Sequence, residues 1–156
     1  MANSYTYSFL DVHAAIDGPG GNFPLSGDRV GIAQEGITVT ATGDKNVMTI
    51  GADGSWMHSL RGDDSGSVTV TLLRTSPVNR QLQEMYNYQK QSSANWGRNT
   101  ITIRDVSRGD TVTCQGVAFA KAPDRPFAEE GGTYQWTFHA GQIEGQIGSG
   151  TPEIEA

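Results

Sequence analysis

Three histidines are the residues of this chain with the widest range of chemistry, because imidazole both transfers protons and binds metals. They are His13, His58 and His139, and no second histidine or cysteine stands near any of them at a metal-ligand spacing. Asp11 and His13 would share one face of a strand, but two ligands alone are a weak signal. The pattern favours ordinary surface or core histidines, so we predict neither a metal nor a cofactor.

The remaining reactive groups do not predict an enzyme. Cys114, the only cysteine, lies in a strand pattern among apolar neighbours rather than at a helix start that would activate a thiolate, so we expect a buried thiol. No Gly-x-Ser-x-Gly sequence is present. Asp63-Asp64 and Glu129-Glu130 fall in turn-rich segments, where neighbouring carboxylates usually point to water.

Two kinds of glycine motif are better explained by loops than by ligands. Gly18-Pro19-Gly20-Gly21 lacks the lysine and hydroxyl of a phosphate-binding loop, and we predict an exposed loop over residues 17–28. Arg61-Gly62-Asp63 and Arg108-Gly109-Asp110 spell a tripeptide that some receptors bind, yet Gly-Asp also suits a tight turn between strands. We predict turns at both.

Charge argues against tight binding of nucleic acid. The formal net charge is −6, and no lysine or arginine follows Arg125 while five glutamates do. Affinity for phosphates depends largely on cations, so DNA is expected to pass such a surface without sticking. The chain lacks the basic and apolar regions of a signal peptide and any long apolar stretch, so we expect synthesis in a reducing cytoplasm and no membrane partner.

The elements that must position these residues are mostly strands. Only one helix is predicted, over about residues 77–92, because Ser76 suits a cap and Pro77 suits the first helical position. Its apolar stripe consists of Val78, Leu82, Met85 and Tyr86. Alternating patterns predict strands over 5–12, 30–33, 37–41, 47–50, 68–72, 101–103, 112–119 and 134–138.

These elements predict a mainly β fold: an antiparallel β-sandwich or barrel with one flanking helix, as a single domain over 1–156. Hairpins are predicted over 36–51 and 101–114, and an ordered loop or short irregular strand carrying apolar anchors is predicted over 51–60. We expect a loop over 122–132, because two prolines there block a central strand, and flexible termini including 148–153. With 36% hydrophobic residues and 20 glycines, the domain is expected to need neighbours to bury its surface.

Threonines alternate with apolar residues in the first predicted hairpin. Thr38, Thr40 and Thr42 would all point to one face, while the other face is apolar. Such a strand buries one side and turns the other to water or to a wet channel. An ordinary sandwich and a ring with a lumen explain this pattern equally well.

Several ordered blocks resemble one known family. They are residues 44–60, 68–79, 85–87, 104–110 and 130–136, including Gly54-Ser55-Trp56-Met57-His58 and Thr75-Ser76-Pro77-Val78-Asn79. Together they are similar to the tail-tube proteins of contractile-tailed bacteriophages, from about residue 7 to residue 150. The resemblance implies a small β-sandwich or barrel with one flanking helix, and a non-enzymatic subunit whose hexameric rings stack into the inner conduit for DNA.

The resemblance also implies partners and a place. The chain would contact itself, the tail sheath, the tape measure and the baseplate or tail-end proteins, would let DNA pass transiently, and would reside in the virion tail. Another virion tail component, or a module of similar fold that binds the host surface, remains the alternative.

Three sets of contact residues follow from this hypothesis. Between rings we predict contacts from the loop 52–66, aided by the N-terminal segment and the loop 123–132. We predict that the two hairpins supply the strands that line the lumen. The helix is predicted to face the sheath. The inter-ring candidates are Trp56, Met57 and Leu60, the lumen candidates are Thr38, Thr40 and Thr42, and the sheath candidates are Arg80, Gln83, Glu84 and Asn87.

Overall fold

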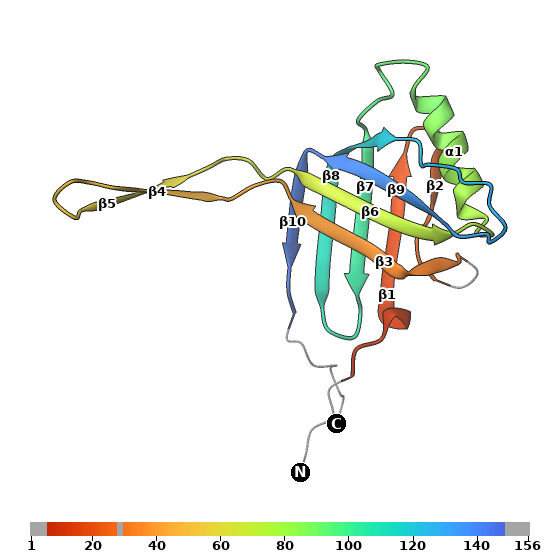
Figure 1. Cartoon of the computed structure of the whole chain (residues 1–156), viewed down its shortest axis with the longest axis horizontal. Helices are drawn as coiled ribbons and strands as arrows, with labels where there is room; N and C mark the ends of the chain where they lie inside the picture. Colours follow the sequence, from red (N-terminus) through yellow and green to blue (C-terminus); the bar gives the residue numbers. More distant parts are fainter. Residues whose placement is uncertain (1–5, 28–29, 149–156) are drawn as a thin grey trace, which may run out of the picture.

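The computed structural model describes residues 6–27 and 30–148, which form a curled antiparallel sheet, one α-helix and a projecting hairpin (Figure 1). In chain order the elements are η1 (Phe9–Asp11), β1 (Val12–Gly18), β2 (Gly21–Pro24), β3 (Ile32–Ala41), β4 (Asn46–Ile50), β5 (Trp56–Leu60), β6 (Gly66–Leu73), α1 (Val78–Gln89), β7 (Asn99–Asp105), β8 (Asp110–Lys121), β9 (Thr133–Ala140) and β10 (Gln142–Gln146). The predicted mainly β fold with one flanking helix is confirmed.

Strand β8 turns the sheet into a half-barrel. The strands follow the order β2-β1-β7-β8-β9-β6-β3, and β10 also pairs with β8. Along one side, β8 pairs with β7 between Asp110 and Val117; along the other, residues 111–115 pair with β10 and residues 118–121 pair with β9. Gly116 lies between these two parts at φ 62°, a conformation that favours glycine. The bend there lets one strand serve both halves of the curled sheet.

Aromatic side chains fill the space between the sheet and the helix. The Phe119 ring lies 5.5 Å from the Tyr86 ring, 5.9 Å from Trp136 and 4.9 Å from Phe138, measured between ring centroids. Helix α1 adds Val78, Leu82 and Met85 to this buried cluster, and Tyr86 packs against it partly buried. The predicted apolar stripe of the helix is therefore its core-facing side.

Serine 76 begins the helix as predicted. The Val78 amide donates to Ser76 Oγ at 3.2 Å, and the Ser76 hydroxyl donates to the carbonyl oxygen of Val30. Pro77 already has helical torsion angles, φ −67° and ψ −19°. The cap thus satisfies an amide of the first turn and also ties the helix start to the segment before β3.

Buried amides hold both ends of the helix against the sheet. Near its end, Gln89 and Asn99 are fully buried and exchange two hydrogen bonds of 2.7 and 3.0 Å, while Gln89 Nε2 also donates to Pro19 O at 2.8 Å. Near its start, the Trp136 indole donates to Asn79 Oδ1 at 3.0 Å. Each buried polar group here has a partner, which sets where the helix lies.

The structure corrects the predicted start of the sheet. No strand forms over residues 6–8, since the Leu10 amide donates to Ser8 Oγ at 3.1 Å and η1 follows; residue 5 lies outside the described residues. The predicted loop 17–28 is wrong over its first half, because Pro19 and Gly20 form a tight turn and β2 pairs with β1. Of the strand predicted at 30–33, only residues 32–33 are in a strand, where they begin the longer β3.

The predicted hairpin over 36–51 is wrong. Strand β3 pairs with β6, from Ile37 opposite Val70 to Ala41 opposite Gly66, and β4 pairs with β5 instead. Within residues 51–60, predicted as an ordered loop or a short irregular strand, residues 56–60 form the regular strand β5. The apolar residues of β3 pack in the core beside β6, so β3 does not pair with β4. The chain therefore reverses between β4 and β5, at residues 51–55, rather than at 43–46.

The later strands agree with the sequence patterns. Strands β7 and β8 form the predicted hairpin, β6 covers 68–72, and β9 covers the aromatic run 134–138. Arg108-Gly109-Asp110 lies in the turn of this hairpin, as predicted, but Arg61-Gly62-Asp63 lies in extended chain between β5 and β6 and forms no turn. Of the tail predicted to be flexible, residues 149–156 lie outside the described residues.

Candidate assembly surfaces

Residues 42–65 form an arm that leaves the half-barrel and points into solvent (Figure 1). Its strands β4 and β5 pair only with each other, in a two-stranded sheet separate from the main one. Every residue from 42 to 64 is exposed. An isolated two-stranded hairpin is marginally stable in water, so this shape suggests that the arm is completed by a partner.

One face of the arm carries four large apolar side chains beside Asn46 and His58, whose side chains lie 3.2 Å apart. Residues opposite each other in an antiparallel pair share a face, and the pairs are Asn46 with Leu60, Met48 with His58 and Ile50 with Trp56. The exposed fractions are 56% for Met48, 57% for Ile50, 70% for Trp56 and 83% for Leu60. We call these four side chains the apolar arm face. Contiguous exposed apolar surface marks a contact site.

The tip of the arm is closed by local hydrogen bonds. The Gly51 amide donates to Ser55 O at 2.7 Å, and Asp53 Oδ1 accepts from the Ser55 amide at 3.0 Å and the Ser55 hydroxyl at 2.6 Å. The hydrogen bonds from the Ser55 hydroxyl and amide hold the pKa of the Asp53 carboxyl below its ordinary value. Gly54 has φ 88°, which suits glycine at this turn.

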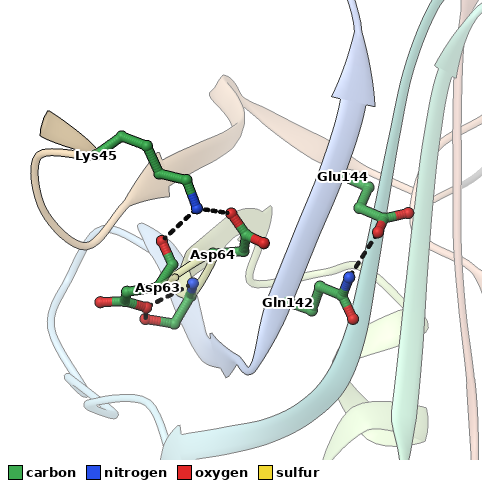
Figure 2. Close-up of polar contacts among 6 residues, drawn as sticks. Lys45, Asp63, Asp64, Gln142 and Glu144 are labelled. Atoms are coloured by element: carbon green, nitrogen blue, oxygen red, sulfur yellow. Dashed lines mark hydrogen bonds and ion pairs between the residues drawn. The ribbon is translucent and has the colours of Figure 1, made fainter. Parts of the chain in front are cut away.

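Polar contacts join the two sides of the arm at its base, as Figure 2 shows for Lys45, Asp63 and Asp64, and one backbone bond links the base to the half-barrel. Lys45 Nζ lies 2.5 Å from Asp64 Oδ1, and the Ile143 amide of β10 donates to the Asp64 carbonyl at 2.8 Å. Asp63 Oδ1 accepts from the amide and the hydroxyl of Ser65, at 2.9 and 2.6 Å, which lowers the pKa of Asp63. These contacts direct the arm away from the body.

The structure places the predicted inter-ring residues on both faces of the arm. Trp56 and Leu60 share the apolar arm face, whereas Met57 points to the other face, opposite Thr49. Met48 and Ile50 belong to the same surface and were not predicted as contacts. The Asp53-Gly54 pair between two apolar runs is a hairpin signal that would have found them.

The three predicted lumen threonines are all exposed. Thr38 and Thr40 alternate along β3 with the partly buried Ile37 and Val39, and Thr42 lies at the base of the arm. The register extends this polar face across two more strands, in the rows Thr38, Thr69, Thr137 and Thr40, Ser67, His139. The structure thus brings Thr38 and Thr40 together with polar residues of β6 and β9.

The predicted sheath-facing residues lie along the outer side of α1. Arg80, Glu84 and Asn87 are exposed and Gln83 is partly buried. Arg80 Nε lies 3.0 Å from Glu84 Oε1, and Gln83 Nε2 donates to Asn87 Oδ1 at 3.0 Å. Arg125 also donates to Gln83 Oε1 at 2.7 Å, which joins the loop after β8 to the helix.

The potentially reactive residues are dispersed. His13, His58 and His139 are exposed on β1, β5 and β9. Within residues 6–27 and 30–148, no three His, Cys, Asp or Glu side chains gather where they could hold a metal ion. Cys114 is fully buried, and burial raises the pKa of its thiol. In the same described part of the chain, no helix is long and apolar enough to cross a membrane.

Solved structures with this fold come from contractile injection systems. A chain of the PVC sheath–tube complex in the extended state is 12% identical, with 92% of this chain and 93% of that chain covered at a TM-score of 0.59. A chain of the PVC sheath/tube terminator is 13% identical, with 94% and 100% covered at a TM-score of 0.60. The tube-terminating cap of the anti-feeding prophage is 12% identical, with 94% and 95% covered at 0.57. At these identities the likeness shows the fold alone.

Comparison of the sequence with family models is more specific. No curated protein matches this chain. The model described as bacteriophage PhiTE tail tube protein matches residues 4–148, which is nearly the whole chain and includes every contact residue predicted above. The half-barrel, the single covering helix and the match along the sequence agree, and the chain belongs to the family of the bacteriophage PhiTE tail tube protein.

Proposed function

We propose that this chain is the structural, non-enzymatic subunit of a phage tail tube, and that its hexameric rings stack into the conduit through which DNA leaves the virion. The observation that carries the proposal is the arm, whose apolar face has no partner within the described chain. Membership of a tail tube family supports the placement in the virion tail.

Ring formation would use the open edges of the half-barrel. In the described sheet, β3 pairs only with β6, so its other edge has backbone groups available for a neighbouring copy. Pairing edges around a closed ring removes surfaces that would otherwise aggregate. The rows of threonine beside this edge, which contain no lysine or arginine, suit a lumen that DNA passes without binding.

The other partners follow from the remaining surfaces. We assign the outer side of α1, with Arg80, Gln83, Glu84 and Asn87, to the tail sheath. The ends of the tube would meet the tape measure and the baseplate or tail-end proteins. Chains of the same fold in a sheath–tube complex and a sheath/tube terminator support a sheath and a tube-end protein as partners.

Electron microscopy of the purified protein tests the proposal. We expect rings and stacked tubes from the unmodified chain, and rings without stacks from Trp56→Asp, because a charge on the apolar arm face opposes contact with apolar surface. The matched control is Val106→Asp, at a residue 54% exposed in the β7–β8 turn, which should form tubes. If the unmodified protein stays monomeric at every concentration and salt, the proposal is wrong.

A further inference from the structure

A cavity of about 820 Å³ opens between the N-terminal segment and the first half of β3. Its apolar lining comes from Tyr7, Phe9 and Leu10 on one side and from Ile32, Ala33 and Ile37 on the other. Leu10 is 89% exposed and Tyr7 is 63% exposed, so the rim of the cavity presents apolar side chains to solvent. We call this site the N-terminal pocket.

The irregular start of β3 leaves this space open. The register between β3 and β6 shifts between Ile32 and Ile37, so regular pairing does not cover this half of the strand. Gly36, within this stretch of shifted register, has φ 65°, a conformation that favours glycine. The pocket is therefore part of the fold of the half-barrel.

The pocket and the arm lie at opposite ends of the same strand. The N-terminal pocket is at the beginning of β3, and the arm follows its end at Ala41, pointing away from the body (Figure 1). The last lining residue on β3 is Ile37, so residues 38–41 of the strand, roughly 13 Å at about 3.3 Å per residue, separate the pocket from the arm, which points outward (Figure 1). The arm of one copy therefore does not reach its own pocket, whereas a head-to-tail contact between copies would join the two.

The two surfaces also match in chemistry. Among the described residues, the lining of the pocket contains no Asp, Glu, Lys or Arg, and neither do strands β4 and β5 of the arm. Joining them would remove apolar surface from water on both sides.

We propose that the N-terminal pocket of one copy receives the apolar arm face of a second copy, in the adjacent ring. This inference rests on the proposed function and adds the receiving site to it. Because donor and receiver are different surfaces, each copy gives one arm and accepts another, so the contact continues along the tube instead of closing in a pair.

A complementation experiment tests this pairing. Trp56→Asp removes the donor, and Leu10→Asp removes the receiver without touching the fold, because the Leu10 side chain is 89% exposed. Each variant alone should form rings that do not stack. In a mixture, Leu10→Asp rings keep the donor arm and Trp56→Asp rings keep the receiving pocket, so electron microscopy should show pairs of rings that grow no further. Val106→Asp is again the control that should form tubes.

The outcomes separate the two proposals. If Trp56→Asp stacks as the unmodified chain does, the arm does not join rings, and both proposals fail. If Trp56→Asp loses stacking but Leu10→Asp stacks normally, or the mixture forms no paired rings, only the N-terminal pocket is wrong as the receiver. Equal melting temperatures of the two dissociated variants would show that both are folded.

Photo-crosslinking locates the receiver directly. With p-benzoylphenylalanine in place of Trp56 in assembled tubes, mass spectrometry should find links to residues 7–13 or 31–37 of another copy. Links concentrated on any other surface would overturn the assignment even if tubes form.

Discussion

The half-barrel and the arm use the same apolar residue types for opposite purposes. Trp136 is 1% exposed in the half-barrel and donates its indole N–H to Asn79, whereas Trp56 is 70% exposed on the arm. In the body, apolar side chains stabilise the folded chain by packing against β-strands and helix α1. On the arm the same residue types are exposed to solvent, and in the proposed function they contact another copy.

The two regions also differ in how their strands find partners. The half-barrel depends on pairings between distant residues, such as Val68 with Phe138, while the arm pairs neighbours across one short turn. The arm can therefore form early and locally, but only its base is held by the body. We expect mutations to divide accordingly into those that change folding and those that change assembly.

The largest predicted effect distinguishes the two tryptophans. Trp136→Ala should lower the free energy of unfolding by about 3–5 kcal/mol, because it leaves a cavity and an unpaired Asn79 side chain. Trp56→Ala should change it by less than about 0.5 kcal/mol, because the residue is exposed. Urea unfolding of dissociated protein measures both, and comparable losses at the two positions would contradict the comparison.

A smaller loss is expected at the buried amide pair of the half-barrel. Gln89→Ala should cost about 1–3 kcal/mol, because Asn99 loses both side-chain hydrogen bonds while remaining buried. Gln81→Ala, on the exposed side of the same helix, is the matched control and should be close to neutral. The same urea titration measures both; equal stabilities would mean that the pair does not hold the helix end.

The helix cap should contribute less again. Ser76→Ala removes the acceptor for the Val78 amide and the bond to Val30, and we expect a loss of about 1 kcal/mol in thermal or urea unfolding. Ser93→Ala, at an exposed position after the helix, provides the control. An unchanged midpoint for Ser76→Ala would show that Pro77 alone is enough to begin the helix.

The smallest effect is a pH dependence confined to the arm. The pKa of Asp53 is lower in the folded chain than its ordinary value of 3.8. The stabilisation of the arm's turn by the ionised Asp53 carboxylate is therefore present above that value and is lost as pH falls through the folded pKa. The protection factor of the Ser55 amide, which is the intrinsic hydrogen-exchange rate divided by the observed rate, should therefore fall at acidic pH. Asp53→Asn should remove this pH dependence. Asp44→Asn is the control, and a loss of protection spread over the half-barrel would contradict a local effect.

The sequence by itself determined the local elements and the family. The periodicity of Val78, Leu82 and Met85 with the Ser76 cap predicts α1, and the aromatic alternation of 134–138 predicts β9, because both signals depend on neighbours along the chain. The buried Cys114 followed in the same way from its strand context. The blocks that resemble tail-tube proteins indicated the family that the match over residues 4–148 then showed.

Only the tertiary structure decided which strands pair and which apolar residues stay exposed. The alternation of residues 37–41 fits pairing with β4 or with β6 equally well, and the choice of β6 depends on core packing between distant segments. That choice releases β4 and β5 as an arm and places Met48 and Ile50 beside Trp56, a juxtaposition that requires the three-dimensional register. It also leaves the N-terminal pocket open at the other end of β3, because two segments that no local pattern links form its walls.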